Sequence, residues 1–161
     1  MEGLFFRKAS DNDIDSIYNN LKLCSENMYK EHGLEHWIPV YPTEKIKEDI
    51  NSKQVYIVEY NNQIVGNFIL TDKMNSLWKT ESKAIYLSKL AIVPEYSGKG
   101  LGKKCMKYIE NLAKNEGYEN IRFDVYDKSL NTIAFYKKLG YTVTDTAKTR
   151  RFTVLLMEKR V

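Results

Sequence analysis

The chain has 161 residues, of which 43% are hydrophobic and 29% charged, with a formal net charge of +4. This length suffices for an apolar core, and we expect a single domain over residues 1–161. No apolar run approaches the roughly 18 residues that cross a bilayer, and the N-terminus does not resemble a signal peptide, so a membrane is not an expected partner. Acidic and basic residues are interspersed along the chain, so nucleic acid is not an expected partner either.

The two cysteines, Cys24 and Cys105, both fall within helical patterns and lie far apart in the sequence. Small disulfide-rich domains and metal clusters use more cysteines at closer spacing. We therefore expect both thiols to fill the core, and a reducing cytoplasm is the expected location.

The N-terminal third is predicted to contain one strand and two helices. A short strand over residues 4–8 precedes a helix that Ser10 caps, in which apolar residues recur at spacings of three and four. Residues 32–42 contain one glycine and two prolines and are expected to be irregular. A shorter helix, capped by Thr43, then runs to about Ile50.

The rest of the chain alternates between strand and helix signals. The Asn61–Asn62 pair tolerates positive φ and predicts a hairpin between its two flanking strands, while Pro94, Gly117 and Gly140 mark the ends of later elements. The expected strands are 55–59, 64–70, 84–93, 121–125, 141–146 and 151–158, and the expected helices are 100–116 and 129–139.

The segment from Pro94 to Lys103 lies between a predicted strand and a predicted helix, with glycines at three alternate positions, Gly98, Gly100 and Gly102. Glycines let backbone N–H groups approach a ligand closely, and a helix N-terminus favours negative charge. The neighbouring lysines add positive charge. A phosphate or pyrophosphate is therefore the expected ligand.

Two known phosphate loops do not fit this segment. A Walker A loop would need glycine where Ser97 stands and Ser or Thr where Lys104 stands. A dinucleotide-binding loop would need its third glycine one residue later, and it normally follows the first strand of βαβ repeats. The alternative interpretation, an ordinary glycine turn that starts a helix and binds no ligand, is not excluded by the sequence.

The order strand, Pro94, then Ser97-x-x-Gly100-x-Gly102 opening a long helix resembles the acetyl-CoA loop of the GNAT superfamily of N-acetyltransferases. That family usually has Gln or Arg at the first loop position. In this chain that position is Ser97, so the resemblance covers the backbone N–H groups of the loop and not that side chain.

A second block, from Phe135 to Tyr141, resembles the family's second signature, in which a helical Tyr is followed four residues later by Gly and an aromatic residue. The signature usually has Asn seven residues before the Tyr. Ser129 occupies that position, and Asn131 is displaced by two residues. The order of elements over essentially the whole chain also matches that family.

The resemblance implies a mixed α/β (α+β) fold, with a mainly antiparallel twisted sheet of about six to seven strands and helices on both faces. It implies transfer of the acetyl group of acetyl-CoA to a primary amine by direct attack in a ternary complex, without a metal. Tyr136 is the implied catalytic acid, and a chain of waters the expected base. The implied acetyl-CoA-binding residues are Leu90, Ala91, Ile92, Ser97, Gly98, Lys99, Gly100, Leu101, Gly102, Lys103, Asn131 and Tyr136.

The resemblance places acceptor recognition in the first two helices and their connection, where Glu35, His36, Trp37 and Tyr41 are the candidates. Aromatic and acidic groups together would suit a cationic amine, whereas Trp37 could equally anchor a packed lid. His36 and His32 lack a credible third metal ligand.

The expected acceptor is a small-molecule amine or the amine of a peptide or protein. Dimers are common in that family, which leaves a homodimer open. A non-catalytic CoA-binding or regulatory module on the same fold is the alternative function.

Overall fold

The computed structural model covers residues 1–161 and contains every helix and strand that the sequence predicts, most of them with ends within two residues of those expected. The strands are β1 (Leu4–Lys8), β2 (Gln54–Tyr60), β3 (Gln63–Thr71), β4 (Ala84–Ile92), β5 (Asn120–Tyr126), β6 (Thr142–Lys148) and β7 (Thr153–Arg160). The helices are α1 (Ile14–His32), α2 (Thr43–Ser52), α3 (Leu101–Asn115) and α4 (Leu130–Lys138), with 3-10 turns at Asp11–Asp13 and Pro94–Tyr96.

The seven strands form one sheet in the order β1-β2-β3-β4-β5-β7-β6. The pairs β1–β2, β2–β3, β5–β7 and β6–β7 are antiparallel, whereas β4 and β5 run parallel. The predicted mixed α/β fold, with a mainly antiparallel sheet of six to seven strands and flanking helices, is confirmed.

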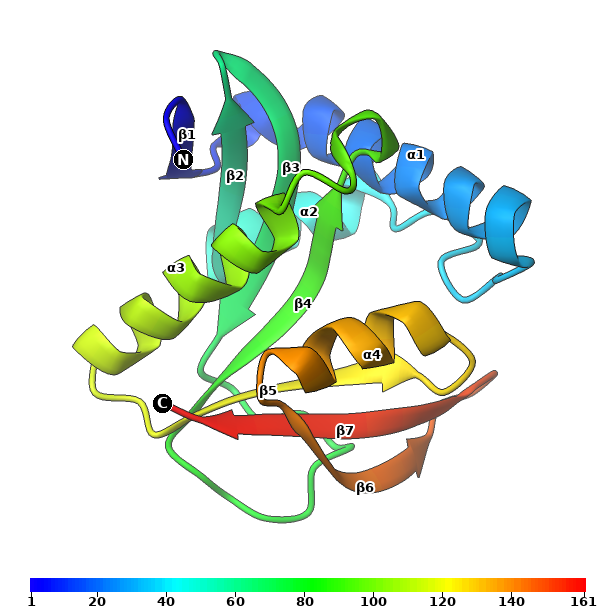
Figure 1. Ribbon diagram of the computed structural model, residues 1–161, viewed down its shortest axis with the longest axis vertical. Coiled ribbons are helices and arrows are strands. Elements are labelled where there is room, and N and C mark those ends of the chain that lie inside the picture. Colours follow the sequence, from blue (N-terminus) through cyan, green and yellow to red (C-terminus); the bar gives the residue numbers. More distant parts are fainter. The chain divides into compact units, whose positions relative to one another are not determined.

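The chain forms two compact units, and β4 and α3 each contribute to both. The first unit consists of Met1–Leu70 and Lys89–Cys105, and the second of Thr71–Ser88 and Met106–Val161. Figure 1 shows the arrangement of elements within each unit.

In the first unit, α1 and α2 lie on the same side of β2 and β3 (Figure 1). The apolar face of α1 packs on the strands because residues three and four apart share one side of a helix. The fully or nearly fully buried side chains of this core are Ile17, Leu21, Cys24, Ile46, Val55, Ile57, Ile69 and Ala91.

Two local predictions in the first unit have different outcomes. Asn61 and Asn62 have φ of 50° and 67°, which confirms the hairpin turn between β2 and β3. The predicted cap of the second helix is wrong. Pro42, and not Thr43, is the capping residue, because its carbonyl accepts the first helical hydrogen bonds, from the backbone N–H groups of Lys45 and Ile46, each at 3.1 Å.

In the second unit, α4 lies across β5 and β7 and packs through aromatic side chains (Figure 1). The ring of Phe123 on β5 lies 4.2 Å from that of Tyr136 and 5.0 Å from that of Tyr141, measured between centroids. Because side chains alternate along a strand, the neighbouring Arg122 points to the opposite face of the sheet.

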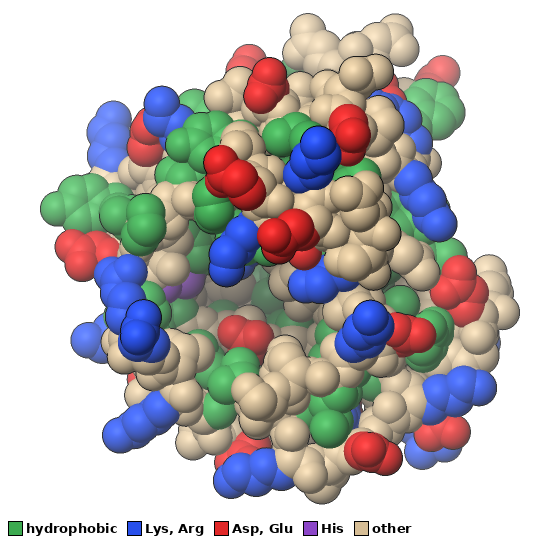
Figure 2. Space-filling model, turned by 180° about the vertical axis from the view of Figure 1, so that it is seen from behind, with side chains coloured by type: hydrophobic (Ala, Val, Ile, Leu, Met, Phe, Trp, Pro, Cys, Tyr) green, Lys and Arg blue, Asp and Glu red, His purple; other side chains and the backbone are tan.

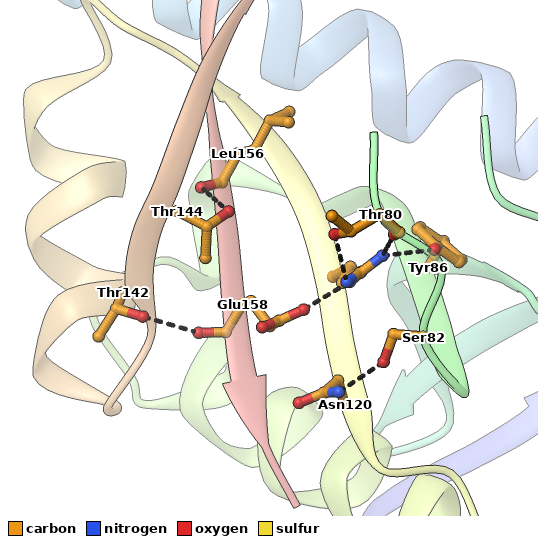
Figure 3. A network of polar contacts seen from close by, with 9 residues as sticks. Thr80, Ser82, Tyr86, Asn120, Thr142, Thr144, Leu156 and Glu158 are labelled. Atoms are coloured by element: carbon orange, nitrogen blue, oxygen red, sulfur yellow. Dashed lines mark hydrogen bonds and ion pairs between the residues drawn. The ribbon is translucent and has the colours of Figure 1, made fainter. Parts of the chain in front are cut away.

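Arg122 is the centre of a polar network on that face, part of which Figure 3 shows. Its side chain is 5% exposed and pairs with Glu158 on β7. It donates to the backbone carbonyl of Thr80 at 2.7 Å and to the Tyr86 hydroxyl at 3.0 Å, and its guanidinium lies 4.4 Å from the ring centroid of Trp78. The network thereby holds the long connection between β3 and β4 against the sheet.

The core and surface agree with the composition. Cys24 and Cys105 are buried and free, and burial raises the pKa of each thiol to about 12, so both remain protonated core side chains. No helix is long and apolar enough to cross a membrane. Figure 2 shows basic and acidic side chains intermixed over one face of the molecule.

Candidate functional site

The glycine-rich turn of the first unit leaves β4 at Ile92 and enters α3 at Leu101. Gly98 and Gly100 are exposed and have φ of +74° and +81°, a conformation that side chains other than glycine rarely adopt. A Cβ atom built on either glycine would meet no other atom within 4 Å. The space over the turn is therefore open and bounded by backbone.

This turn has the chemical features of a phosphate cradle. The first N–H groups of α3 have no partner within the helix, and the helix dipole favours an anion there. Lys99, Lys103 and Lys104 are all exposed around the same turn. Ser97 donates its hydroxyl proton to the carbonyl of Pro94 at 2.8 Å, so its side chain closes the turn. These features fit a pyrophosphate group.

The strand that leads into the turn approaches β3 unusually closely. A Cβ atom on Gly66 would lie 2.4 Å from the backbone oxygen of Ala91, so only glycine fits at this position of β3. The backbone N–H of Val93 then donates to the carbonyl of Val65 at 2.9 Å. Ala91 is buried, whereas Leu90 and Ile92 remain partly exposed.

Lys89 interrupts the regular geometry of β4. Its φ is 53°, although it is not a glycine and lies inside a strand. The side-chain amide of Asn67 donates to the Lys89 carbonyl at 3.0 Å, and Asn20 on α1 donates to the Asn67 side-chain oxygen at 3.2 Å. Two buried amides therefore fix the backbone at Lys89.

Two of the candidate acceptor residues, Tyr41 and Trp37, lie against the Lys89 side chain. The Lys89 ammonium nitrogen lies 4.8 Å from the ring centroid of Tyr41 and 5.8 Å from that of Trp37. The rings of His36 and Trp37 are 6.1 Å apart, and Trp37 packs against the core of the first unit. Glu35 is exposed at the surface of the same loop. The structure thus brings Trp37, Tyr41 and His36 together beside a lysine that the sequence pattern did not single out, and it shows no side-chain contact between Glu35 and these residues.

The remaining candidates lie on α4, in the second unit. Tyr136 is buried, with its ring against Phe123. Asn131 is exposed, whereas Ser129 is buried and its hydroxyl has no hydrogen-bond partner. Because buried hydroxyls are rarely left unpaired, Ser129 is a second candidate for contact with a ligand. The sequence signal for Ser129 is its position seven residues before Tyr136, where the second signature usually has Asn.

The candidate residues contain no obvious metal site. His32 is the last residue of α1, and the following Gly33 has φ of 67°, so His32 and His36 do not share a helix. No group of three or more His, Cys, Asp or Glu side chains is arranged to hold a metal ion.

Comparison with known families identifies one matching model, described as the acetyltransferase (GNAT) family, over residues 14–141. Among curated proteins, thialysine N-epsilon-acetyltransferase of Bos taurus is 35% identical over 65 residues, which cover 40% of this chain and 37% of that protein. Spermidine N(1)-acetyltransferase of Thermoplasma acidophilum is 25% identical over 150 residues, covering 87% of this chain and 89% of that protein. The chain thus matches little more than a third of the bovine relative's length.

Two solved structures illustrate the fold match. The PaiA N-acetyltransferase of Thermoplasma acidophilum, solved in complex with coenzyme A, superposes with a TM-score of 0.78 and 23% identity over 98% of this chain and 99% of that one. A GNAT family acetyltransferase of Elizabethkingia anophelis, solved with acetyl-CoA bound, has a TM-score of 0.68 and 16% identity over the full length of both chains.

The partly buried environment of His36 generates a prediction about pH. Burial, with a smaller contribution from the positive charge of Lys89, lowers the pKa of His36 from 6.5 to about 4. Between these values the unfolded chain binds a proton that the folded chain does not, so His36 should make the free energy of unfolding fall as pH drops from 6.5 toward 4.

Urea unfolding of wild type and His36→Gln at several pH values measures this effect. The variant should lose less stability than wild type over that interval. His32→Gln, which changes the exposed histidine at the end of α1, is the matched control. Parallel pH profiles for wild type and His36→Gln would contradict the prediction.

Proposed function

Because the chain belongs to the acetyltransferase (GNAT) family, we propose that it transfers the acetyl group of acetyl-CoA to a primary amine, by direct attack in a ternary complex. The observation that carries the proposal is the open glycine turn between β4 and α3, with Gly98 and Gly100 at positive φ. A turn of this kind at a helix N-terminus binds phosphate groups through its backbone N–H groups.

Acetyl-CoA is the proposed cosubstrate, held by two segments of the first unit. The turn from Ser97 to Lys103 binds the pyrophosphate, with the exposed lysines neutralising its charge. The backbone of Leu90, Ala91 and Ile92 binds the pantetheine arm and the thioester. Asn131 and the unpaired hydroxyl of Ser129 are the candidates for further polar contacts to that arm.

The proposed reaction requires an uncharged amine and a proton for the departing sulfur. The acceptor nitrogen bonds to the thioester carbonyl carbon as the carbon–sulfur bond breaks. The hydroxyl of Tyr136 supplies the proton to sulfur, since a phenol with an ordinary pKa near 10 is protonated at neutral pH. Water takes the proton that the amine loses, because β4 carries no carboxylate.

The acceptor is proposed to be a small primary amine or the amine of a peptide or protein. The names of two relatives, a thialysine acetyltransferase and a spermidine acetyltransferase, support a small-molecule amine as the acceptor. Trp37, Tyr41, His36 and Glu35 are the proposed acceptor-side residues. The two free cysteines support a reducing compartment such as the cytoplasm. A homodimer is the proposed assembly.

Gly100→Val tests acetyl-CoA binding. Saturating acetyl-CoA should stabilise wild type by about 2.7 kcal/mol at a hundredfold excess over the dissociation constant, measured as a thermal shift. The valine side chain would fill the space proposed for the pyrophosphate, so the shift should disappear.

Gly33→Val is the matched control for this experiment, because Gly33 also has positive φ and open space around its Cβ position. It should cost comparable stability and keep the acetyl-CoA shift. An unchanged shift in Gly100→Val, or none in wild type, would contradict the proposal.

Tyr136→Phe tests the proposed acid. The ring packing against Phe123 remains, so stability and acetyl-CoA affinity should change little, while turnover should fall by about 10²–10⁴-fold. Free thiol release at saturating acceptor is the measurement.

Tyr141→Phe is the matched control within the same aromatic cluster. The Tyr141 hydroxyl donates to Glu110 at 2.9 Å, so its loss should lower stability by about 1 kcal/mol and leave turnover near wild type. Near-normal turnover in Tyr136→Phe would assign the acid role elsewhere. Acetyl-CoA binding without thiol release for any amine would favour the non-catalytic alternative.

A further inference from the structure

Lys89 lies between the strand residues proposed to bind the thioester and the aromatic rings proposed to bind the acceptor. It directly precedes Leu90, the first of the residues proposed to bind the thioester end of acetyl-CoA. Its side chain lies on the two rings proposed to receive the acceptor, at 4.8 Å from the Tyr41 centroid and 5.8 Å from the Trp37 centroid. The side chain is only partly buried, so a bound acceptor can reach it.

The backbone holds Lys89 in this position. The positive φ of 53° turns the residue out of the regular strand, and the hydrogen bond from buried Asn67 to its carbonyl fixes that turn. A pre-organised ammonium group loses less conformational freedom on binding a ligand than a lysine on an open surface.

The aromatic faces of the acceptor cluster therefore already hold a cation. Besides burial, which has the larger effect, the positive charge of Lys89 lowers the pKa of the neighbouring His36. Asp49, the buried carboxylate of α2, accepts the Tyr41 hydroxyl at 2.6 Å and pairs with Lys53 at 3.4 Å. A second positive charge on the acceptor would meet a like charge at these rings, whereas an anionic group would find a partner.

We propose that Lys89 determines acceptor choice, binding a carboxylate on the acceptor and thereby favouring amino-acid-like amines over polyamines. This inference rests on the proposed acetyl transfer to an amine. It replaces the cationic acceptor expected from the aromatic and acidic residues of the loop, because the chain's own ammonium group occupies the ring faces.

Matched acceptor pairs that differ only in a carboxylate test the inference. Lysine is compared with cadaverine, and 6-aminohexanoate with pentylamine, by thiol release from acetyl-CoA. A hydrogen-bonded carboxylate–ammonium contact should give the carboxylate-bearing member of each pair about tenfold or more higher kcat/KM. Equal values, or a preference for cadaverine, would overturn the inference.

Lys89→Met removes the charge and keeps most of the apolar stem. It should reduce the preference within each pair to about threefold or less, mainly by raising the KM of the carboxylate-bearing amine, since this is the cost of losing one charged contact. Lys89→Arg should keep much of the preference, and Lys22→Met, an exposed lysine of α1, should keep all of it. A Lys89→Met enzyme that retains the wild-type preference would overturn the inference.

Melting temperatures and acetyl-CoA thermal shifts of the same variants separate two kinds of failure. Wild type that turns over amines without preference for a carboxylate refutes the role of Lys89 and leaves the proposed acetyl transfer intact. Wild type that neither binds acetyl-CoA nor releases thiol with any amine refutes the proposed function and this inference with it.

Discussion

The side-chain amide of Asn67 lies in the interior of the first unit, where no part of the residue is exposed. Its oxygen accepts a hydrogen bond from Asn20 on α1, and its nitrogen donates to the carbonyl of Lys89 on β4. A buried polar group without partners costs about 1–3 kcal/mol, so the three residues hold one another in place. The position of β4 relative to α1 and β3 depends on this short chain of hydrogen bonds.

The candidate functional residues of the first unit follow from that constraint. Because the backbone turns at Lys89, its side chain reaches the rings of Trp37 and Tyr41. At Gly66, the residue before Asn67 on β3, the absence of a side chain lets the Ala91 carbonyl come close. The strand then ends at Pro94 and opens into the glycine turn. A single strand thus carries the proposed thioester contacts, the proposed acceptor charge and the approach to the phosphate cradle.

The sequence predicts the fold well because its signals are local. Apolar spacing identifies α1 and α3, the Asn61–Asn62 pair identifies a hairpin, and Pro94 marks the end of a strand. The one local error concerns Thr43, where a proline carbonyl takes the capping position that a threonine hydroxyl normally supports. The glycine turn is also a local feature, so its positions can be identified from the sequence alone.

The role of Lys89 could not be predicted in the same way. Its contacts to Trp37 and Tyr41 join residues roughly fifty positions apart, and a lysine in a strand usually faces solvent. A lone asparagine among the apolar residues of β3 was a visible signal for a buried hydrogen bond, but it does not specify the partner. The unpaired hydroxyl of Ser129 likewise becomes apparent only once its burial is known.

Transfer of the acetyl group to an amine nitrogen is measured most directly by counting products with isotopically labelled acetyl-CoA. The released thiol is quantified in the same reaction as the labelled N-acetyl amine identified by mass spectrometry. One amide formed for each thiol released is the predicted result. Thiol release without a labelled amide would mean hydrolysis of the thioester, and no release with any amine would mean binding alone. Either result would contradict the proposed acetyl transfer to an amine.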